Sequence, residues 1–360
     1  MYRTMGCVPV KSKYLDLQLR NKTFSMDNSS KKARVVRFSQ TGGPEVLTIE
    51  QVVVPFPGPN EVRVNVKAFA LNRADAMYRQ GHYLETPIFP STLGYDASGI
   101  IEAVGSEVRG LSVGDKVNVI GLFSLNEYGT YGELILLPEY AVRKFPSSLS
   151  FEKAASVWTS YLSMYGLLVN LAKVQAGQHV LINAASSSAG LATIQIANAL
   201  GAVPIAVTRS IRKKASLLEA GAAHVILSST AELTTVVKEL TNNKGADIII
   251  DPVGGPAFAK LVAAVAERGQ VFVYGALSEE PTPFPLFEVL INRPLIQGYS
   301  AADILFDHAA LALGVDFINQ GIEEGRLDII IDRTFDFVDV VEATRYLESN
   351  EQIGKIVVRV

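Results

Sequence analysis

Residues 179–207 constrain the fold of this chain more than any other stretch. They begin with a short apolar run, residues 179–183, of the kind that is buried in parallel sheets. A turn of small residues (184–190) follows, then a helical pattern that ends at Gly201, and then a second apolar run (203–207). This order predicts a βαβ unit, whose first turn is where a dinucleotide pyrophosphate would meet a helix N-terminus.

Length and composition favour a globular protein with a large core. The chain has 360 residues, of which 48% are hydrophobic and 19% are charged, so two domains are expected. Its net charge of -3 gives no support for nucleic-acid binding. The single cysteine, Cys7, rules out an internal disulfide framework and suits a reducing compartment, so we expect a cytoplasmic protein. No apolar run approaches the length of a membrane span.

Residues 1–32 differ from the rest of the chain in their charge. This stretch contains seven basic residues and only two acidic ones, Asp16 and Asp27, and no apolar core of signal-peptide length is present. This composition predicts a flexible N-terminal extension, or a natural start at Met26. An organellar transit peptide is the alternative.

Two patterns of secondary structure follow. Residues 33–158 predict an irregular antiparallel β domain, because short alternating or apolar runs are separated by turns rich in glycine and proline. After residue 159, helices and strands alternate, as in a doubly wound parallel sheet. Expected strands are 33–38, 47–54, 61–70, 99–104, 116–120, 132–137, 224–227, 246–250 and 270–274; expected helices are 71–79, 151–168 capped by Ser150, 215–220, 231–241, 256–266, 305–324 and 338–348.

The end of the second strand favours a phosphorylated cofactor. A chain that binds NAD usually carries Asp or Glu about 20 residues past the phosphate turn. Here the strand ends in TRSIRKK, and no acid occurs before Glu219. A basic helix start is unfavourable against the helix dipole unless an anion binds there. Since Arg209 can stack on adenine and contact a 2′-phosphate, we expect NADPH rather than NADH.

Three blocks in the first domain resemble a known family. They read NEVRVNVKAFALNRADAMYRQGHY, LGYDASGIIEAVGSEVRGLSVGDKV and YGTYGEL. In this order they are similar to the GroES-like catalytic domain of the medium-chain dehydrogenase/reductase superfamily, and the resemblance runs from about residue 33 to 360. It implies an α/β protein in which a GroES-like, β-rich catalytic domain (33–158 and 326–360) is interrupted by a doubly wound Rossmann NADP-binding domain (159–325).

The zinc ligands of this superfamily are replaced. Zinc alcohol dehydrogenases carry Cys where this chain has Asn72, and Gly-His-Glu where it reads Gly94-Tyr95-Asp96. Zinc favours thiolate and imidazole ligands, and the four histidines show no ligand spacing. No metal is therefore expected, and the chain resembles the zinc-independent quinone oxidoreductase (zeta-crystallin-like) branch.

The same resemblance nominates catalytic residues. Asn72 and Asp75 match the Asn-x-x-Asp pattern of the branch. This implies that the Asn72 amide donates a hydrogen bond beside the nicotinamide or the substrate carbonyl; a helix cap is the alternative, and for Asp75 a structural role is favoured. Relatives often have tyrosine where Met77 aligns, and here the tyrosine follows one place later as Tyr78. Tyr78 or Tyr131 is a candidate to steady the acceptor oxygen.

The cofactor candidates lie at the turn and at strand ends. Relatives commonly read Gly-Ala-Ser-Gly-Gly-Val-Gly at the turn; here it reads Ala-Ala-Ser-Ser-Ser-Ala-Gly (184–190), and only the last glycine, needed for helix–strand packing, remains. Serine hydroxyls can donate to phosphate, although Ser188 at the helix start would also suit a cap. A βαβ unit without cofactor, and for Thr159 a hydroxyl bonded within its helix, are the alternatives. The candidates are Thr159, Ser186, Ser187, Ser188, Gly190, Arg209, Ser210, Lys213, Asp251, Val253, Gly254, Tyr274, Gly275 and Ala276.

These patterns predict an NADPH-dependent oxidoreductase that reduces quinones or conjugated enones and 2-alkenals by hydride transfer without zinc. An enoyl-thioester reductase and a non-catalytic NADPH-binding protein are the alternatives. No nucleic-acid or membrane partner is expected. The resemblance implies a homodimer through residues 281–300, where Phe284 and Phe287 would line a substrate pocket or pack in the core or an interface.

Overall fold

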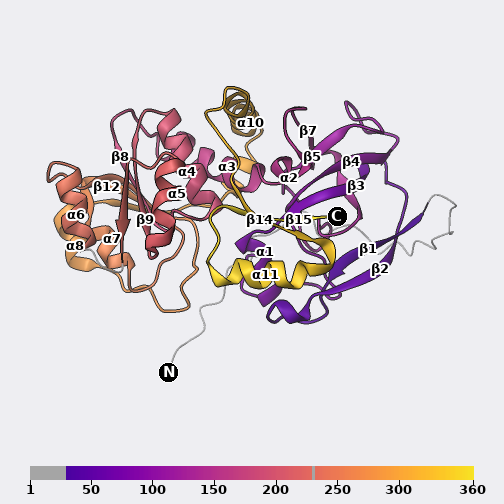
Figure 1. Ribbon diagram of the computed structural model, residues 1–360, viewed down its shortest axis with the longest axis horizontal. Coiled ribbons are helices and arrows are strands. Elements are labelled where there is room, and N and C mark those ends of the chain that lie inside the picture. Colours follow the sequence, from indigo (N-terminus) through magenta and orange to yellow (C-terminus); the bar gives the residue numbers. More distant parts are fainter. Residues whose placement is uncertain (1–29, 229–231) are drawn as a thin grey trace.

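The computed structural model describes residues 30–228 and 232–360, which form two lobes (Figure 1). We call the boundary where the two lobes meet the seam. The predictions for residues 1–29, including Cys7 and the start at Met26, lie outside the described residues. The C-terminal elements, yellow in Figure 1, lie among the indigo N-terminal ones, so both ends of the described chain build the same lobe.

The first lobe is built on a seven-stranded sheet with the order β14-β15-β3-β4-β5-β7, in which β6 also pairs with β3. Strand β3 lies inside the sheet because Val62, Val64 and Val66 alternate along it and are buried. Its strands are β3 (Glu61–Ala70), β4 (Asp96–Val104), β5 (Lys116–Val119), β6 (Leu134–Pro138), β7 (Val142–Lys144), β14 (Ile331–Asp336) and β15 (Lys355–Arg359), with a separate hairpin of β1 (Lys31–Arg37) and β2 (Thr48–Val54).

Short helices cover this lobe. The longest are α1 (Arg73–Gln80) and α11 (Val340–Ser349), and α1 ends at Gly81, which lies in the left-handed region at φ 77°. Tight helical turns η1 (Pro44–Val46), η2 (Glu139–Ala141) and η5 (Phe337–Asp339) connect strands. Because β14, α11 and β15 all belong here, the last 30 residues return to the first lobe after the second is complete.

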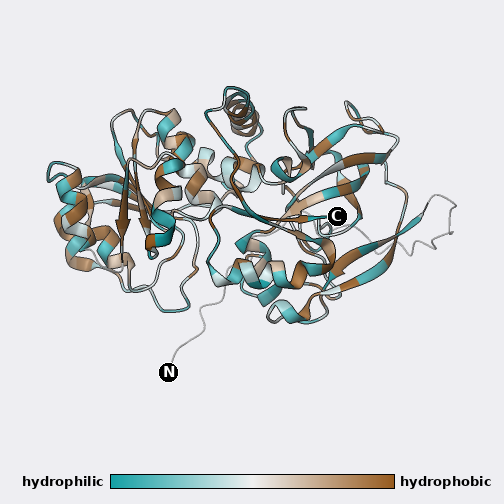
Figure 2. Ribbon diagram, viewed as in Figure 1, coloured by the Kyte–Doolittle hydropathy of each residue, from teal (hydrophilic) through white to brown (hydrophobic). Residues whose placement is uncertain are grey.

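The second lobe confirms the doubly wound sheet. Six parallel strands follow the order β10-β9-β8-β11-β12-β13, and Figure 2 shows hydrophobic residues along the central ones. The strands are β8 (His179–Ile182), β9 (Val203–Thr208), β10 (His224–Leu227), β11 (Ala246–Asp251), β12 (Val265–Val273) and β13 (Leu295–Gly298). The helices are α4 (Ser188–Ala199), α5 (Lys214–Glu219) after the turn η4 (Ile211–Lys213), α6 (Leu233–Leu240), α7 (Phe258–Ala263) and α8 (Leu286–Asn292).

Two helices differ from their prediction, and a third was not predicted. Ser150 caps a helix as expected, but residues 151–168 divide into α2 (Phe151–Ala154), α3 (Trp158–Tyr165) and the π-helix η3 (Gly166–Leu171). The helix predicted at 305–324 begins later, as α10 (His308–Glu323), because Asp307 accepts the amide N–H of Ala309 and Ala310; the short helix α9 (Ala302–Leu305) precedes it. Residues 281–300 contain helix α8 as well as a strand.

Residues 120–123 join the two hydrophobic cores. Ile120 packs in the core around α3 and α4, Phe123 in the core around β3, and Leu122 contacts both. Within the described ranges, no helix is long and apolar enough to cross a membrane.

Candidate cofactor and substrate site

The turn after β8 carries backbone strain at its first residue. Ala184, which stands where relatives carry the first glycine, has φ 50°, in the left-handed region. Its N–H is held by Asn183 Oδ1 at 3.0 Å. A Cβ on Gly190 would lie 2.5 Å from the Ala185 carbonyl oxygen, so this glycine permits α4 to pack closely on the turn, as predicted.

The three serines of the turn have different roles in the fold. Ser187, rather than Ser188, is the N-cap of α4, and its Oγ accepts the Gly190 N–H at 3.0 Å. Ser188 is the first residue of α4, and Ser186 Oγ accepts a bond from Lys213 Nζ at 3.1 Å. All three are half-buried. The three hydroxyls therefore lie at the N-terminus of α4, the kind of helix end that can bind a phosphate.

Asp251, at the end of β11, uses its carboxylate within the fold. Its Oδ1 accepts from Asn183 Nδ2 at 2.8 Å and from the Val253 N–H at 2.9 Å, and its Oδ2 accepts the Gly254 N–H at 3.0 Å. With these donors the carboxylate holds its own loop and the phosphate turn together. This placement favours a positioning role for Asp251 over direct cofactor contact.

The ends of β11 and β12 approach each other closely. The Ser278 N–H donates to the Val253 carbonyl at 2.9 Å, and a Cβ on Gly275 would lie 2.6 Å from the Pro252 oxygen. Gly254 has φ 67°. Ala276 is exposed beside them. The glycines are therefore required for the approach of the two strand ends, which form one edge of the site.

Tyr274 connects this edge to the phosphate turn. Burial raises the pKa of its hydroxyl, against a smaller opposing effect of a hydrogen bond with Ser187. The hydroxyl is therefore neutral at physiological pH, and it remains a hydrogen-bonding group rather than an ion.

The end of β9 is basic, as predicted. Arg209 is exposed, Ser210 is half-buried and its N–H donates to Thr208 Oγ1 at 3.3 Å, and Lys213 lies on η4. Lys213 Nζ donates to three neutral oxygens, those of Ser186 Oγ (3.1 Å) and the carbonyls of Asn350 and Gln352 (2.8 Å each). A cluster of cations beside a helix start fits a phosphorylated dinucleotide such as NADPH.

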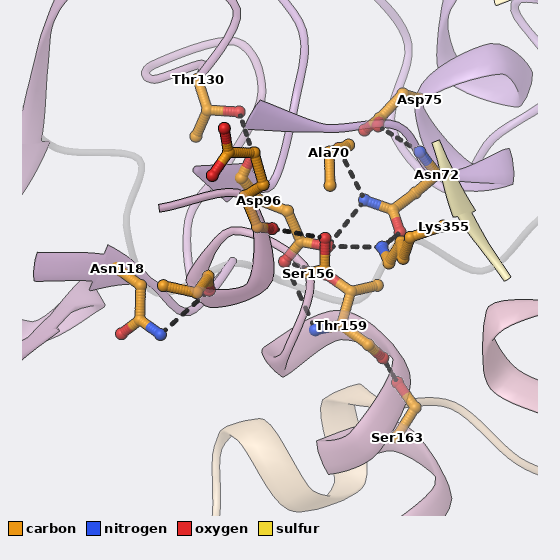
Figure 3. A network of polar contacts seen from close by, with 12 residues as sticks. Ala70, Asn72, Asp75, Asp96, Asn118, Thr130, Ser156, Thr159, Ser163 and Lys355 are labelled. Atoms are coloured by element: carbon orange, nitrogen blue, oxygen red, sulfur yellow. Dashed lines mark hydrogen bonds and ion pairs between the residues drawn. The ribbon is translucent and has the colours of Figure 1, made fainter. Parts of the chain in front are cut away.

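A buried polar network lies at the seam (Figure 3). Lys355 Nζ donates to Asp96 Oδ2 at 2.7 Å and to Asn72 Oδ1 at 2.5 Å, and Asn72 Nδ2 donates to Asp96 Oδ2 at 3.1 Å. Thr159 Oγ1 donates to the other carboxylate oxygen, Asp96 Oδ1, at 2.7 Å. Asp96 is 1% exposed and Lys355 2%, so each charge depends on these partners. Sequence reasoning found Asn72 and Thr159 but missed Lys355.

The network does not fit a zinc ion. Asn72 and Asp96 occupy positions of the zinc-site pattern, and the Lys355 ammonium lies between them. A second cation would be repelled there, and an amide, a phenol and one paired carboxylate are not a tetrahedral zinc set. Elsewhere in residues 30–228 and 232–360, no group of three or more His, Cys, Asp or Glu side chains is placed to hold a metal.

The nominated tyrosines point into the first lobe. Tyr78 is 0% exposed, and its hydroxyl lies 2.8 Å from Ser91 Oγ and donates to Asn126 Oδ1 at 2.9 Å. Tyr131 donates to Asp75 Oδ2 at 2.9 Å. Since both hydroxyls are buried and bonded, their placement favours structural roles. Asp75 also accepts the Asn72 N–H at 2.9 Å, which is the structural role favoured for it.

Two other tyrosines lie beside the loop that joins the cores. Tyr95 directly precedes Asp96. The centroid of its ring lies 5.8 Å from the ring centroid of Phe123 and 6.4 Å from that of Tyr83. Both are half-buried, their hydroxyls interact, and burial raises both pKa values. The sequence signal for Tyr95 is its place at a zinc-ligand position of the family pattern, which lies in the substrate cleft of zinc enzymes with that pattern and so also marks a residue near the acceptor.

Comparisons with known proteins agree with this architecture. Residues 58–147 match the family model for the alcohol dehydrogenase GroES-like domain, and residues 189–319 the model described as zinc-binding dehydrogenase. A quinone oxidoreductase of Pseudomonas aeruginosa is 32% identical over 90% of this chain and 99% of its own length. The structure of Escherichia coli quinone oxidoreductase complexed with NADPH matches with a TM-score of 0.84 and 27% identity, over 91% of this chain and all of that chain.

The similarity extends to a biosynthetic enzyme. The CurF ER cyclopropanase from the curacin A pathway is 28% identical, with a TM-score of 0.81 over 91% of this chain and 99% of its own. The chain therefore belongs to the quinone oxidoreductase family of the medium-chain dehydrogenase/reductase superfamily.

Proposed function

We propose that this protein is an NADPH-dependent oxidoreductase that reduces quinones or conjugated enones and 2-alkenals without zinc. The observation that carries the proposal is the Lys355 ammonium between Asn72 and Asp96, at the position of the zinc-site pattern. With no metal to polarise an isolated carbonyl, acceptors already activated by conjugation are favoured. A relative of the same fold binds NADPH, and the basic end of β9 suits that cofactor.

The proposed cofactor site contains the residues nominated from the sequence. NADPH supplies a hydride when it is bound. The N-terminus of α4 with Ser186 and Ser188 would hold the pyrophosphate, and Arg209, Ser210 and Lys213 the 2′-phosphate. The strand ends at Val253, Gly254, Gly275 and Ala276 would border the nicotinamide half, with Asp251, Tyr274, Ser187 and Gly190 shaping the site. Thr159 and Asn72 support it through Asp96.

The acceptor would lie beside Tyr83 and Tyr95. Because Tyr78 and Tyr131 are bonded inside the lobe, the interacting hydroxyls of Tyr83 and Tyr95 are better placed to hold an acceptor oxygen. Burial raises their pKa values, so both retain their protons and act as hydrogen-bond donors. Hydride would pass to the acceptor carbon or to the quinone, and solvent would supply the matching proton. The substrate-binding domain would comprise residues 33–158 and 326–360, and the cofactor domain residues 159–325.

An acceptor screen tests this function. Purified protein is mixed with NADPH and with quinones, enones, 2-alkenals or enoyl thioesters, and loss of NADPH absorbance is followed with and without a chelator. Oxidation with quinones or enones, unchanged by chelator, is expected. Loss of activity with chelator would contradict the zinc-free reaction. The similarity to the CurF enzyme favours a second candidate, an enoyl-thioester reductase, which oxidation with thioesters alone would support. Binding without oxidation by any acceptor would indicate a non-catalytic NADPH-binding protein.

The cofactor assignment has its own test. The double variant Arg209→Ala with Lys213→Ala should raise the KM for NADPH much more than the KM for NADH, because only NADPH carries the 2′-phosphate. The exposed neighbour Lys214 provides the control variant Lys214→Ala, which should change neither constant. Equal effects of the double variant on both cofactors would overturn the preference for NADPH.

A further inference from the structure

The segment between α11 and β15 is bound to the phosphate turn across the seam. The Gly354 N–H donates to the Ser186 carbonyl at 2.9 Å, and residues 187 and 354 form a parallel β-bridge. From the other side, Lys213 Nζ donates to the carbonyls of Asn350 and Gln352. The last segment of the first lobe therefore holds a side chain of the second lobe in place.

Lys213 carries a charge without a contacting counter-ion. In the part of the chain that the structure describes, Lys213 Nζ forms its hydrogen bonds with neutral oxygens and no ion pair, and the acids whose charges raise its pKa, Asp332 and Glu351, lie farther away. Burial lowers its pKa, and the positive charges of Arg209 and Arg212 act in the same direction. A half-buried ammonium that contacts only neutral oxygens is a place where an anion would be bound strongly.

Arg73 fixes the segment that holds Lys213. Its Nη2 donates to the Leu347 carbonyl at 2.9 Å and also to Asn350 Oδ1. Asn350 ends α11 with φ 60°, in the left-handed region, so the direction of its carbonyl depends on a defined backbone turn. Arg73 is thereby linked to Lys213 through Asn350, although the two side chains belong to different lobes.

We propose that Arg73 and residues 347–352 are specificity-determining for the cofactor: they hold the Lys213 ammonium ready for a 2′-phosphate. This inference rests on the proposed function. A lysine side chain has four flexible carbons, and ordering it on binding costs rotamer entropy. Two carbonyls that already fix Nζ remove that cost, while the longer bond to Ser186 is the one that a phosphate replaces. Preference for NADPH over NADH then depends on the substrate-binding lobe as well as on the Rossmann lobe.

Equilibrium titration of NADPH and NADH, followed by their fluorescence, tests this inference in three variants. Arg73→Met removes the guanidinium that holds residues 347–350. Asn350→Gly removes the side chain that Arg73 contacts, and glycine still permits the left-handed backbone at this position. Lys213→Met removes the cation. Arg73→Met and Asn350→Gly should each weaken NADPH binding about tenfold, because Nζ is no longer preorganised, and leave NADH within about twofold. Arg345→Met, on the exposed side of α11 and paired with Glu342, is the control and should change neither.

A double-mutant cycle separates this inference from the proposed function. If Arg73 acts through Lys213, the double variant Arg73→Met with Lys213→Met should bind NADPH no more weakly than Lys213→Met alone. Additive losses, or an Arg73→Met effect equal for NADPH and NADH, would overturn the inference and leave the cofactor assignment standing. If Lys213→Met itself leaves the NADPH-to-NADH ratio unchanged, the 2′-phosphate site of the proposed function fails as well.

Discussion

Ala184 shows how a single residue stores strain at the centre of the site. An alanine at φ 50° costs about 1–2 kcal/mol relative to the right-handed region, and glycine has no such penalty. Glycine also loses more entropy on folding, so Ala184→Gly should raise the free energy of unfolding by a net amount of up to about 1 kcal/mol. Chemical denaturation measures it. The matched control Ala189→Gly, within α4, should instead lower stability by about 1 kcal/mol. If Ala184→Gly lowers the free energy of unfolding instead, the left-handed backbone at Ala184 does not destabilise the wild type.

Asp75 gives a residue-scale prediction about pH. Burial raises its pKa to about 7, so the folded state favours the protonated carboxyl. The stability that this proton contributes is complete below the pKa of an unfolded aspartate, near 4, and is lost as pH rises through about 7. Between pH 5 and pH 8 the wild type should therefore lose stability relative to Asp75→Asn, which keeps the oxygen that accepts the Asn72 N–H. Denaturant unfolding at both pH values checks this; parallel pH profiles would refute it.

At the scale of elements, the strand β15 brings a charge into the seam. Lys355→Met should lower the free energy of unfolding by about 3–5 kcal/mol, because Asp96 would remain buried without its cation. The double variant Lys355→Met with Asp96→Asn should recover much of that loss, since the amide carries no charge. Thermal and denaturant unfolding compare the two. If the double variant is as unstable as Lys355→Met alone, the loss of stability comes mainly from lost packing and not from the unpaired charge of Asp96.

Elements with strong local patterns were predictable from the sequence. The apolar runs of β8, β9 and β11 and the turn residues around them gave the doubly wound sheet, and Gly190 gave the packing of α4. The break of the helix at residues 155–157 was not predictable, because no Pro or Gly marks it. Nor was the partner of Asn72: Lys355 lies 283 positions away, and only the folded sheet brings the two together.

The site was predictable to a similar degree. The basic end of β9 and the glycines at two strand ends were visible in the sequence because their chemistry is local. Which serine would cap α4, and which tyrosines would turn inward, depended on neighbours from other elements. The prediction that Ser188 would compete as the cap was wrong, because the helix begins one residue after Ser187. The direct cofactor role of Asp251 stays a prediction that its three bonds do not favour.

At the scale of the whole molecule, an apolar face remains open on the Rossmann lobe. Strand β13 is the edge of the parallel sheet, and α8 beside it exposes Phe287 (74%) and Ile291 (70%). Phe284 is exposed as well, so neither phenylalanine packs in the core. We propose that a second copy of this chain covers this face, because an unpaired edge strand next to apolar side chains suits pairing with its own symmetry mate.

Light scattering tests the dimer. The wild type should have the mass of a dimer, and Phe287→Asp with Ile291→Asp should convert it to a monomer, because burying two carboxylates at an apolar interface is unfavourable. Leu313→Asp, an exposed apolar residue on α10, is the control and should leave the mass unchanged. A monomeric wild type would contradict the proposal.

The position of β15 has a consequence for how this protein is made. This strand (Lys355–Arg359) lies between β14 and β3, so the sheet of the first lobe lacks an interior member until these residues have been synthesised. The Rossmann lobe, by contrast, has all six strands by residue 298 and can fold during synthesis. The lobe that is translated first is thus completed last, and its early strands β3 and β4 must wait for β15 during about 250 residues of translation. Chaperone demand during synthesis should therefore centre on the first lobe, and a ribosome that stops before residue 355 would release a protein with one finished lobe and one open sheet.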